Sequence, residues 1–96
     1  MTSGAPTIPD TAKPRLPRGV RLVESAAHGG PVLLAPERVF KADAIAQAIL
    51  QRCTGEATFA EIVDALAAAY GAPRERVAAD VATLLQGLAE KKLLEL

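Results

Sequence analysis

The sequence predicts an α+β domain in which a small three-stranded antiparallel sheet precedes a bundle of three helices. Short runs of branched residues, separated by turn residues, lie between positions 18 and 42. From residue 43 onward, apolar residues recur every three or four positions, which is the helical period. Hydrophobic residues make up 50% of the chain and aromatic ones only 3%, so the core must be aliphatic, which favours helix packing. This arrangement is winged helix-turn-helix-like.

Proline and small polar residues dominate the first 16 residues. Pro6, Pro9 and Pro14 stand among Thr, Ser, Gly and Asp, a composition that neither sustains a helix nor buries much apolar surface. We therefore predict a disordered tail, or a linker to another domain, over residues 1–16. The folded domain is expected to span residues 17–96.

Three strands are predicted at residues 18–25, 31–35 and 38–42. The Gly-containing segment 26–30 supplies the first reversal, and Pro36 with its neighbours supplies a tight second one. Three strands are too few to be stable alone, so the sheet must pack against the helices. Because no strand follows the third one, we expect one of its edges to be unpaired. An open strand edge can accept an extended peptide.

The first two helices carry clear boundary signals. The first is predicted over residues 43–53, with Asp43 as its N-cap and Gly55 in its stop signal. The second opens with a capping box, in which Thr58 and Glu61 each satisfy a backbone donor.

The third helix is expected to be the longest. Gly71 ends the second helix, and Pro73 opens the third at a first-turn position. We expect the third helix to end near Glu90 or Lys91. Residues 92–96 could either extend the helix or form a short extended segment, and the sequence leaves both open.

Composition argues against several functional classes. Eleven Lys and Arg balance eleven Asp and Glu, whereas nucleic-acid binders usually carry a basic excess. The lone His28 and the lone Cys53 have no ligand or base at a useful spacing, so no metal site, cofactor or catalytic residue is predicted. One cysteine, and no segment near the roughly 18 apolar residues of a membrane span, predict a cytoplasmic protein without membrane contact.

Five stretches together cover nearly everything after residue 16. They are PRGVRL (17–22), LLAPERVF (33–40), DAIAQAIL (43–50), GEATFAEIVDALAAAYG (55–71) and VAADVATLLQGLAEKKLL (77–94). These stretches resemble the PqqD family of peptide chaperones in pyrroloquinoline quinone (PQQ) biosynthesis. Two departures stand out. Thr54-Gly55 replaces the Asp-Gly frequent in the family, and Lys91-Lys92 replaces its frequent Lys-Gly.

The resemblance implies a non-catalytic chaperone that binds the ribosomally made precursor peptide PqqA and presents it to the radical SAM enzyme PqqE. It also implies that the peptide adds a strand to the third strand beside the third helix, and that contact with, or fusion to, other PQQ pathway proteins occurs. Which alternate residues of the third strand face the groove between that strand and the third helix stays open, because a one-residue slip exchanges the faces. The predicted peptide-binding residues are Arg38, Val39, Phe40, Lys41, Arg76, Val77, Asp80, Val81 and Leu84.

Two other functions remain open on the sequence. A winged-helix DNA-binding module would have the same architecture, although the third helix carries acidic as well as basic residues. An interaction module could instead pair its open strand edge with a second copy of itself.

Overall fold

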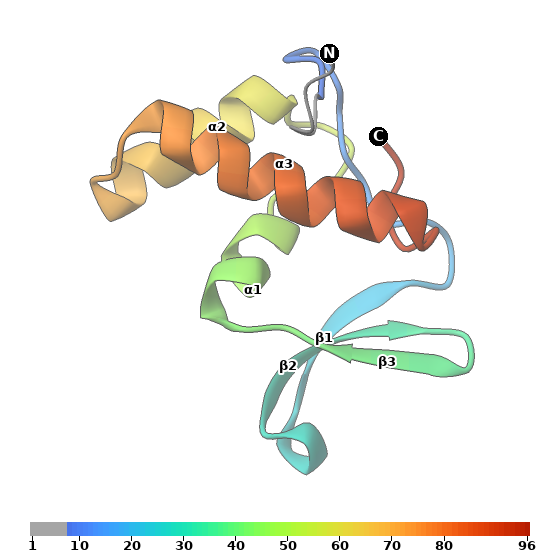
Figure 1. Cartoon of the computed structure of the whole chain (residues 1–96). Coiled ribbons are helices and arrows are strands. Elements are labelled where there is room, and N and C mark those ends of the chain that lie inside the picture. The colour runs from blue at the N-terminus through green and yellow to red at the C-terminus, as the bar shows by residue number, and fades with distance from the viewer. Residues whose placement is uncertain (1–7) are drawn as a thin grey trace.

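A computed structural model describes residues 8–96 and confirms the predicted α+β class. The helices form one half of the molecule and the sheet projects from them as the other half (Figure 1). The elements follow the order β1 (Arg21–Ser25), the 3-10 helix η1 (Ala26–His28), β2 (Gly30–Ala35), β3 (Arg38–Lys41), α1 (Ala44–Leu50), α2 (Phe59–Tyr70) and α3 (Arg74–Glu90).

The sheet is an antiparallel meander of order β1-β2-β3. Leu33 at its centre lies opposite Leu22 on β1 and Phe40 on β3. Ala35 pairs with Arg38, so the β2–β3 turn has two central residues, and the second of them, Glu37, takes a positive φ of 62°. β1 begins three positions later than predicted because residues 17–20 form a turn, closed by the Val20 N–H donating to the Pro17 carbonyl at 3.0 Å.

Helix α1 is shorter than the predicted range of residues 43–53. Asp43 is its N-cap, as predicted, and its carboxylate accepts the Ala46 amide at 2.7 Å. The chain after Leu50 tightens into i→i−3 bonds, which end the α-helix before Cys53. Gly55 has the expected positive φ of 87°, but it lies in the connection to α2 and not at the end of α1.

Every free backbone donor at the start of α2 has a partner. The capping box is present: the Thr58 amide donates to the Glu61 carboxylate at 2.8 Å, and the Glu61 amide donates to the Thr58 hydroxyl at 3.1 Å. The two amides between them donate to carbonyls of the N-terminal segment. The donors that a helix start leaves free are therefore all satisfied.

Residues 8–16, whose composition predicts a tail or linker, pack against the helices instead. The Phe59 amide donates to the Ala12 carbonyl at 2.7 Å, and Arg15 and Glu95 exchange backbone hydrogen bonds of 2.9 and 2.8 Å. Ile8 is buried in the core. Proline rules out a helix here but suits an extended segment, whose carbonyls can accept from other elements. The remainder of the predicted tail, residues 1–7, lies outside the described residues.

Helix α3 ends in a Schellman motif. Pro73 is its N-cap rather than its first helical residue, and the helix ends at Glu90, where the sequence predicts. The Lys92 amide donates to the Ala89 carbonyl at 3.0 Å and the Leu93 amide to the Leu88 carbonyl at 2.9 Å, while Lys92 takes a positive φ of 63°. The chain beyond Lys92 is extended and pairs with Arg15.

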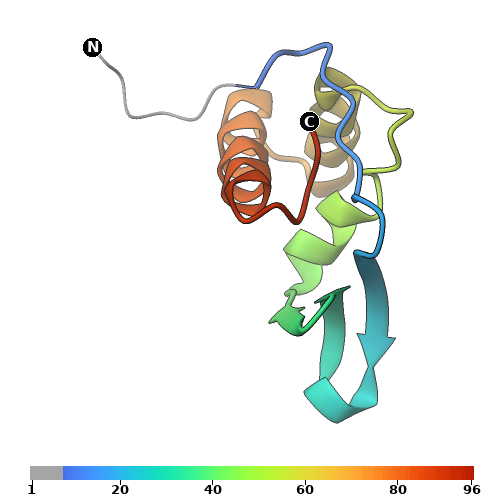
Figure 2. The same cartoon turned by 90° about the vertical axis from the view of Figure 1, so that its right-hand side faces the viewer.

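The core is almost entirely aliphatic, as its composition requires. Figure 2 shows α2 and α3 side by side, with α1 between them and the sheet. Leu33 carries the sheet into this core, where it joins Leu66, Val81 and Leu85. In residues 8–96 no polar or charged residue is buried. No helix in that range combines the length and the apolar character that crossing a membrane requires.

Candidate functional site

The outer edge of β3 is the starting point of the candidate site. The Ala42 amide donates to the Pro31 carbonyl at 3.0 Å, which makes this a hydrogen-bonded pair. Such pairs alternate along an antiparallel ladder, so Phe40 and Arg38 also direct their backbone groups toward β2. Val39 and Lys41 therefore direct theirs outward. No other described strand pairs with that edge.

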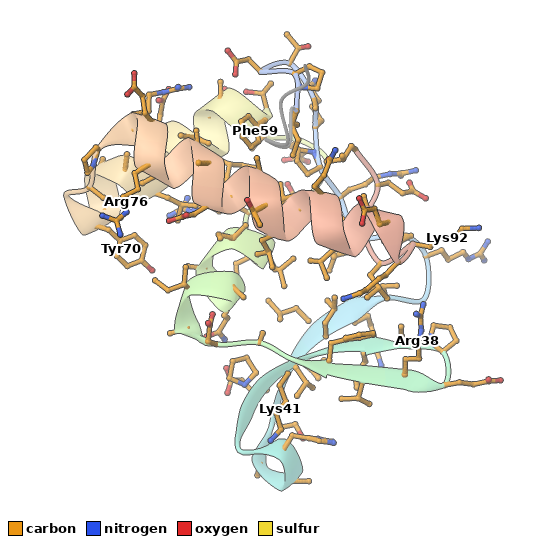
Figure 3. All side chains as sticks on the ribbon, in the orientation of Figure 1. Arg38, Lys41, Phe59, Tyr70, Arg76 and Lys92 are labelled. Carbon is orange, nitrogen blue, oxygen red and sulfur yellow. The ribbon has the colours of Figure 1, made fainter. Side chains whose placement is uncertain are left out.

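Side chains on β3 alternate between the two faces of the sheet. Phe40 is half-buried and packs against the core, which puts it and Arg38 on the side of the sheet that faces α3. Val39, 47% exposed, and Lys41 lie on the far face. Figure 3 shows Arg38 between the sheet and α3, and Lys41 pointing away from the helices. The structure thus resolves the face assignment that the sequence left open.

The core-facing side of α3 carries an apolar stripe. Val77, Val81, Leu84 and Leu88 follow one another at intervals of three and four residues, the spacing of one helix face. Val81 is buried, and the other three are half-buried against the core. At the C-terminal end of α3 this helix meets β3, where Arg38 donates to the Lys91 carbonyl at 3.1 Å.

A pocket opens at the N-terminal half of α3, and we call it the α3 pocket. Its volume is about 140 Å³. Ile45 and Ile49 line it from α1, Leu66 and Tyr70 from α2, and Val77 and Val81 from α3. Asp80 is the charged residue of the lining, and within residues 8–96 no ion pair joins it to Arg76.

The C-terminal half of α3 ends in a positively charged cluster, in contrast to the apolar α3 pocket. We call this cluster the basic end, and it comprises Arg38, Phe40 and Lys91. The Arg38 guanidinium lies 5.6 Å and the Lys91 ammonium 5.7 Å from the centroid of the Phe40 ring. Arg38 also donates to the Lys91 carbonyl at 3.1 Å, which satisfies a free acceptor at the end of α3. In Figure 3 Lys92 lies at the same end of the molecule.

The structure brings together most of the predicted binding residues. Val77, Asp80 and Val81 line the α3 pocket, and Arg38 and Phe40 form most of the basic end. Leu84 lies on the stripe between them. The edge involves Val39 and Lys41 through their backbone, while Arg76 is exposed and is not part of the pocket lining.

Sequence reasoning missed the other walls of the site. The periodicity places Ile45 and Tyr70 on the apolar stripes of their helices, yet both are exposed at the pocket. The available signal is the position of Tyr70 at the last turn of α2, directly before the helix stop at Gly71. Lys91 is recognisable from the sequence only as a helix end.

The single cysteine and the single histidine of the chain each have a local hydrogen-bond partner. Cys53 is buried, burial raises the pKa of its thiol to about 12, and its Sγ donates to the Ile49 carbonyl at 3.4 Å. His28 is exposed in η1 and shares a 2.8 Å hydrogen bond with Ser25. Across residues 8–96 no three potential metal ligands gather into a group.

A family model described as Coenzyme PQQ synthesis protein D (PqqD) matches residues 30–94. The chain belongs to the PqqD family. A PqqA binding protein of Rhizobium meliloti is 43% identical over 96 residues, covering 100% of this chain and 98% of that protein. A bifunctional coenzyme PQQ synthesis protein C/D of Methylorubrum extorquens is 44% identical over 82 residues, which are 85% of this chain but 22% of that longer protein.

Two solved PqqD structures share the fold. One is the solution NMR structure of the PqqD truncation of Methylobacterium extorquens PqqCD, described as a functional and stand-alone recognition element for ribosomally synthesised and post-translationally modified peptides. It superposes with a TM-score of 0.74 at 43% identity, over 86% of this chain and 88% of that one. The crystal structure of PqqD from Xanthomonas campestris gives a TM-score of 0.59 at 41% identity, over 94% and 100% of the two chains.

Proposed function

We propose that this PqqD family member binds the precursor peptide PqqA as an added strand on the outer edge of β3. The observation that carries the proposal is the open edge itself, where Val39 and Lys41 present backbone donors and acceptors beside the apolar stripe of α3. Backbone pairing would supply affinity and the α3 side would supply side-chain contacts. The relatives that are PqqA binding proteins support the choice of peptide.

We further propose that the chain is not itself an enzyme and that it presents the bound peptide to the radical SAM enzyme PqqE in the cytoplasm. The α3 pocket supports this, because its lining offers one carboxylate, Asp80, and no serine, cysteine, lysine or histidine. A peptide held as an edge strand keeps one backbone edge and one face free, so a second protein can reach it. The relative that joins C and D activities in one chain supports contact with other pathway proteins.

A proline scan of the strand edges tests the binding mode. In Val39→Pro the lost amide is one that points outward, so the β2–β3 ladder should persist while an added strand loses a hydrogen bond and meets the proline ring. Glu24→Pro is the control, because the alternation along β1 directs the Glu24 amide to the opposite outer edge of the sheet. Glu24→Ala accounts for the hydrogen bond that Gln47 donates to the Glu24 carboxylate, which both substitutions remove. Binding of synthetic PqqA would be measured by calorimetry and by amide chemical shifts, with duplex DNA as a competing ligand.

We expect Val39→Pro to weaken PqqA binding by about tenfold or more. A tenfold change in Kd corresponds to roughly 1.4 kcal/mol, and the loss of one hydrogen bond together with a steric clash costs more than this. Glu24→Pro should bind as the wild type does. If folded Val39→Pro bound PqqA with unchanged affinity, strand addition at β3 would be refuted. Salt-sensitive binding of duplex DNA in place of the peptide would favour the DNA-binding alternative.

A further inference from the structure

The surface at the two ends of α3 differs in chemistry, and this difference bears on which peptide segments fit. At one end lies the apolar α3 pocket, and at the other lies the basic end. This inference rests on the proposed binding of a peptide at β3, because the added strand would carry the side chains of the peptide past both ends of α3.

The α3 pocket is sized for one apolar side chain. Its volume of about 140 Å³ is close to that of an apolar cavity of roughly 150 Å³ that takes up benzene. A phenyl ring or a branched aliphatic side chain therefore fits. Ile45 is 53% and Tyr70 54% exposed at this pocket, an arrangement that leaves apolar surface in water until a ligand covers it.

The basic end is arranged to receive a carboxylate. Arg38 and Lys91 approach the same Phe40 ring, so two positively charged side chains surround one aromatic side chain. Within residues 8–96 neither forms an ion pair, although Glu37 and Glu90 are their neighbours in the chain. The hydrogen bond from Arg38 to the Lys91 carbonyl fixes the guanidinium in place before any ligand arrives. A peptide carboxylate at this end would meet two cationic hydrogen-bond donors that have no ion-pair partner among the described residues.

The distance between the two ends sets the spacing of the two side chains. Lys91 lies ten positions after Val81 and fourteen after Val77, which corresponds to about 15 to 21 Å along α3. A strand advances about 3.3 Å per residue, so four to six strand residues span this distance. Side chains on one face of a strand are separated by an even number of positions.

We propose that the α3 pocket and the basic end together select a peptide segment in which an apolar side chain and an acidic side chain lie four or six positions apart. The apolar residue occupies the α3 pocket, and the carboxylate binds Arg38 and Lys91 at the basic end. A spacing changed by one residue turns the carboxylate to the other face of the added strand.

The experiment is a double-mutant cycle between the peptide and the protein, read out by calorimetry. Each Asp or Glu of PqqA is changed to Asn or Gln, each large apolar residue is changed to Ala, and every peptide is measured against wild type, Arg38→Gln and Lys91→Gln. Arg52→Gln removes the same charge from an exposed position in the turn after α1 and serves as the matched control. Ala72→Leu fills the α3 pocket from its lining.

We expect one acidic substitution to raise the Kd by about three- to tenfold in wild type, with little further effect in Arg38→Gln or Lys91→Gln. One apolar substitution, four or six positions away, should raise the Kd by about tenfold or more and lose that effect in Ala72→Leu. Inserting one residue between the two should abolish the acidic contribution.

Absence of binding to wild type would overturn the proposed function and this inference together. If PqqA bound wild type, but each acidic substitution in the peptide changed the Kd equally for wild type, Arg38→Gln and Arg52→Gln, this inference alone would be overturned. Coupled apolar and acidic residues that lay an odd number of positions apart would likewise overturn the inference and leave the proposed function standing.

Discussion

Lys92, the residue after the C-cap of α3, is held in a left-handed backbone conformation that a lysine adopts only at a cost. Its φ is 63°, and the Schellman hydrogen bonds at the end of α3 require this conformation. Leu93, the next residue, is fully buried, so the chain cannot leave the helix by another route without exposing it. Glycine is the residue that most often occupies this position in a Schellman motif. We therefore predict that Lys92→Gly raises the stability of the domain.

The magnitude of the gain depends on two opposing effects. The left-handed conformation costs a residue with a Cβ about 1–2 kcal/mol. Glycine avoids that cost but loses roughly 0.5–1 kcal/mol more conformational entropy on folding. The net gain is about 0.5–1 kcal/mol, which for a domain of this size raises Tm by roughly 2–8 °C. Thermal unfolding followed by circular dichroism, together with urea titration, would measure it.

Lys92→Ala is the matched variant, because it removes the same charge and side chain but keeps the Cβ. We expect it to be no more stable than the wild type, and less stable than Lys92→Gly by about 1 kcal/mol. If Lys92→Gly and Lys92→Ala had the same Tm, backbone strain at this position would play no part in stability, and the predicted gain from glycine would be refuted.

Three further predictions concern other parts of the fold. Thr58→Ala should lower stability by about 1 kcal/mol through loss of the α2 N-cap, while Thr58→Ser should lie within about 0.5 kcal/mol of wild type; equal losses would contradict this. Deleting residues 1–12 should lower Tm relative to deleting residues 1–7, because only the longer deletion removes carbonyls that accept from α2. The folded pKa of the Cys53 thiol, about 12, exceeds its usual 9.0, so the thiol ionises more easily in the unfolded chain. The contribution of Cys53 to stability should therefore be constant below about pH 9 and fall above it by up to ~1.4 kcal/mol per pH unit. If the difference in stability between wild type and Cys53→Ala stayed flat to about pH 10.5, burial of the thiol would not be the cause.

The elements that the sequence predicts well are those whose signals are local. Thr58 and Glu61 form the capping box at their three-residue spacing, Gly71 ends α2 in the left-handed conformation, and Asp43 caps α1. Each of these interactions joins residues close in the chain, so the residue types alone specify it. The open outer edge of β3 can also be inferred, because it depends only on the order of the strands.

The features that the sequence does not predict depend on contacts between distant residues. Arg15 is 80 positions from Glu95, and no local pattern indicates that these two segments pair. Composition correctly excludes a helix from residues 8–16 but cannot distinguish an extended segment that packs from one that does not. The α3 pocket likewise arises where three helices meet, so its walls at Ile45 and Tyr70 resemble ordinary core positions.

The packed N-terminal segment also bears on why the β3 edge stays accessible to a peptide. The carbonyls of residues 10 and 12 accept from the start of α2, and Arg15 pairs with Glu95, so both end segments of the described chain are held on the helical half of the molecule. Figure 1 shows them at the side opposite the sheet. The described end segments therefore leave the β3 edge uncovered. This gives a physical reason why a PqqD region can be part of a longer bifunctional chain, as in the Methylorubrum extorquens relative, while the β3 edge proposed to bind the peptide remains uncovered.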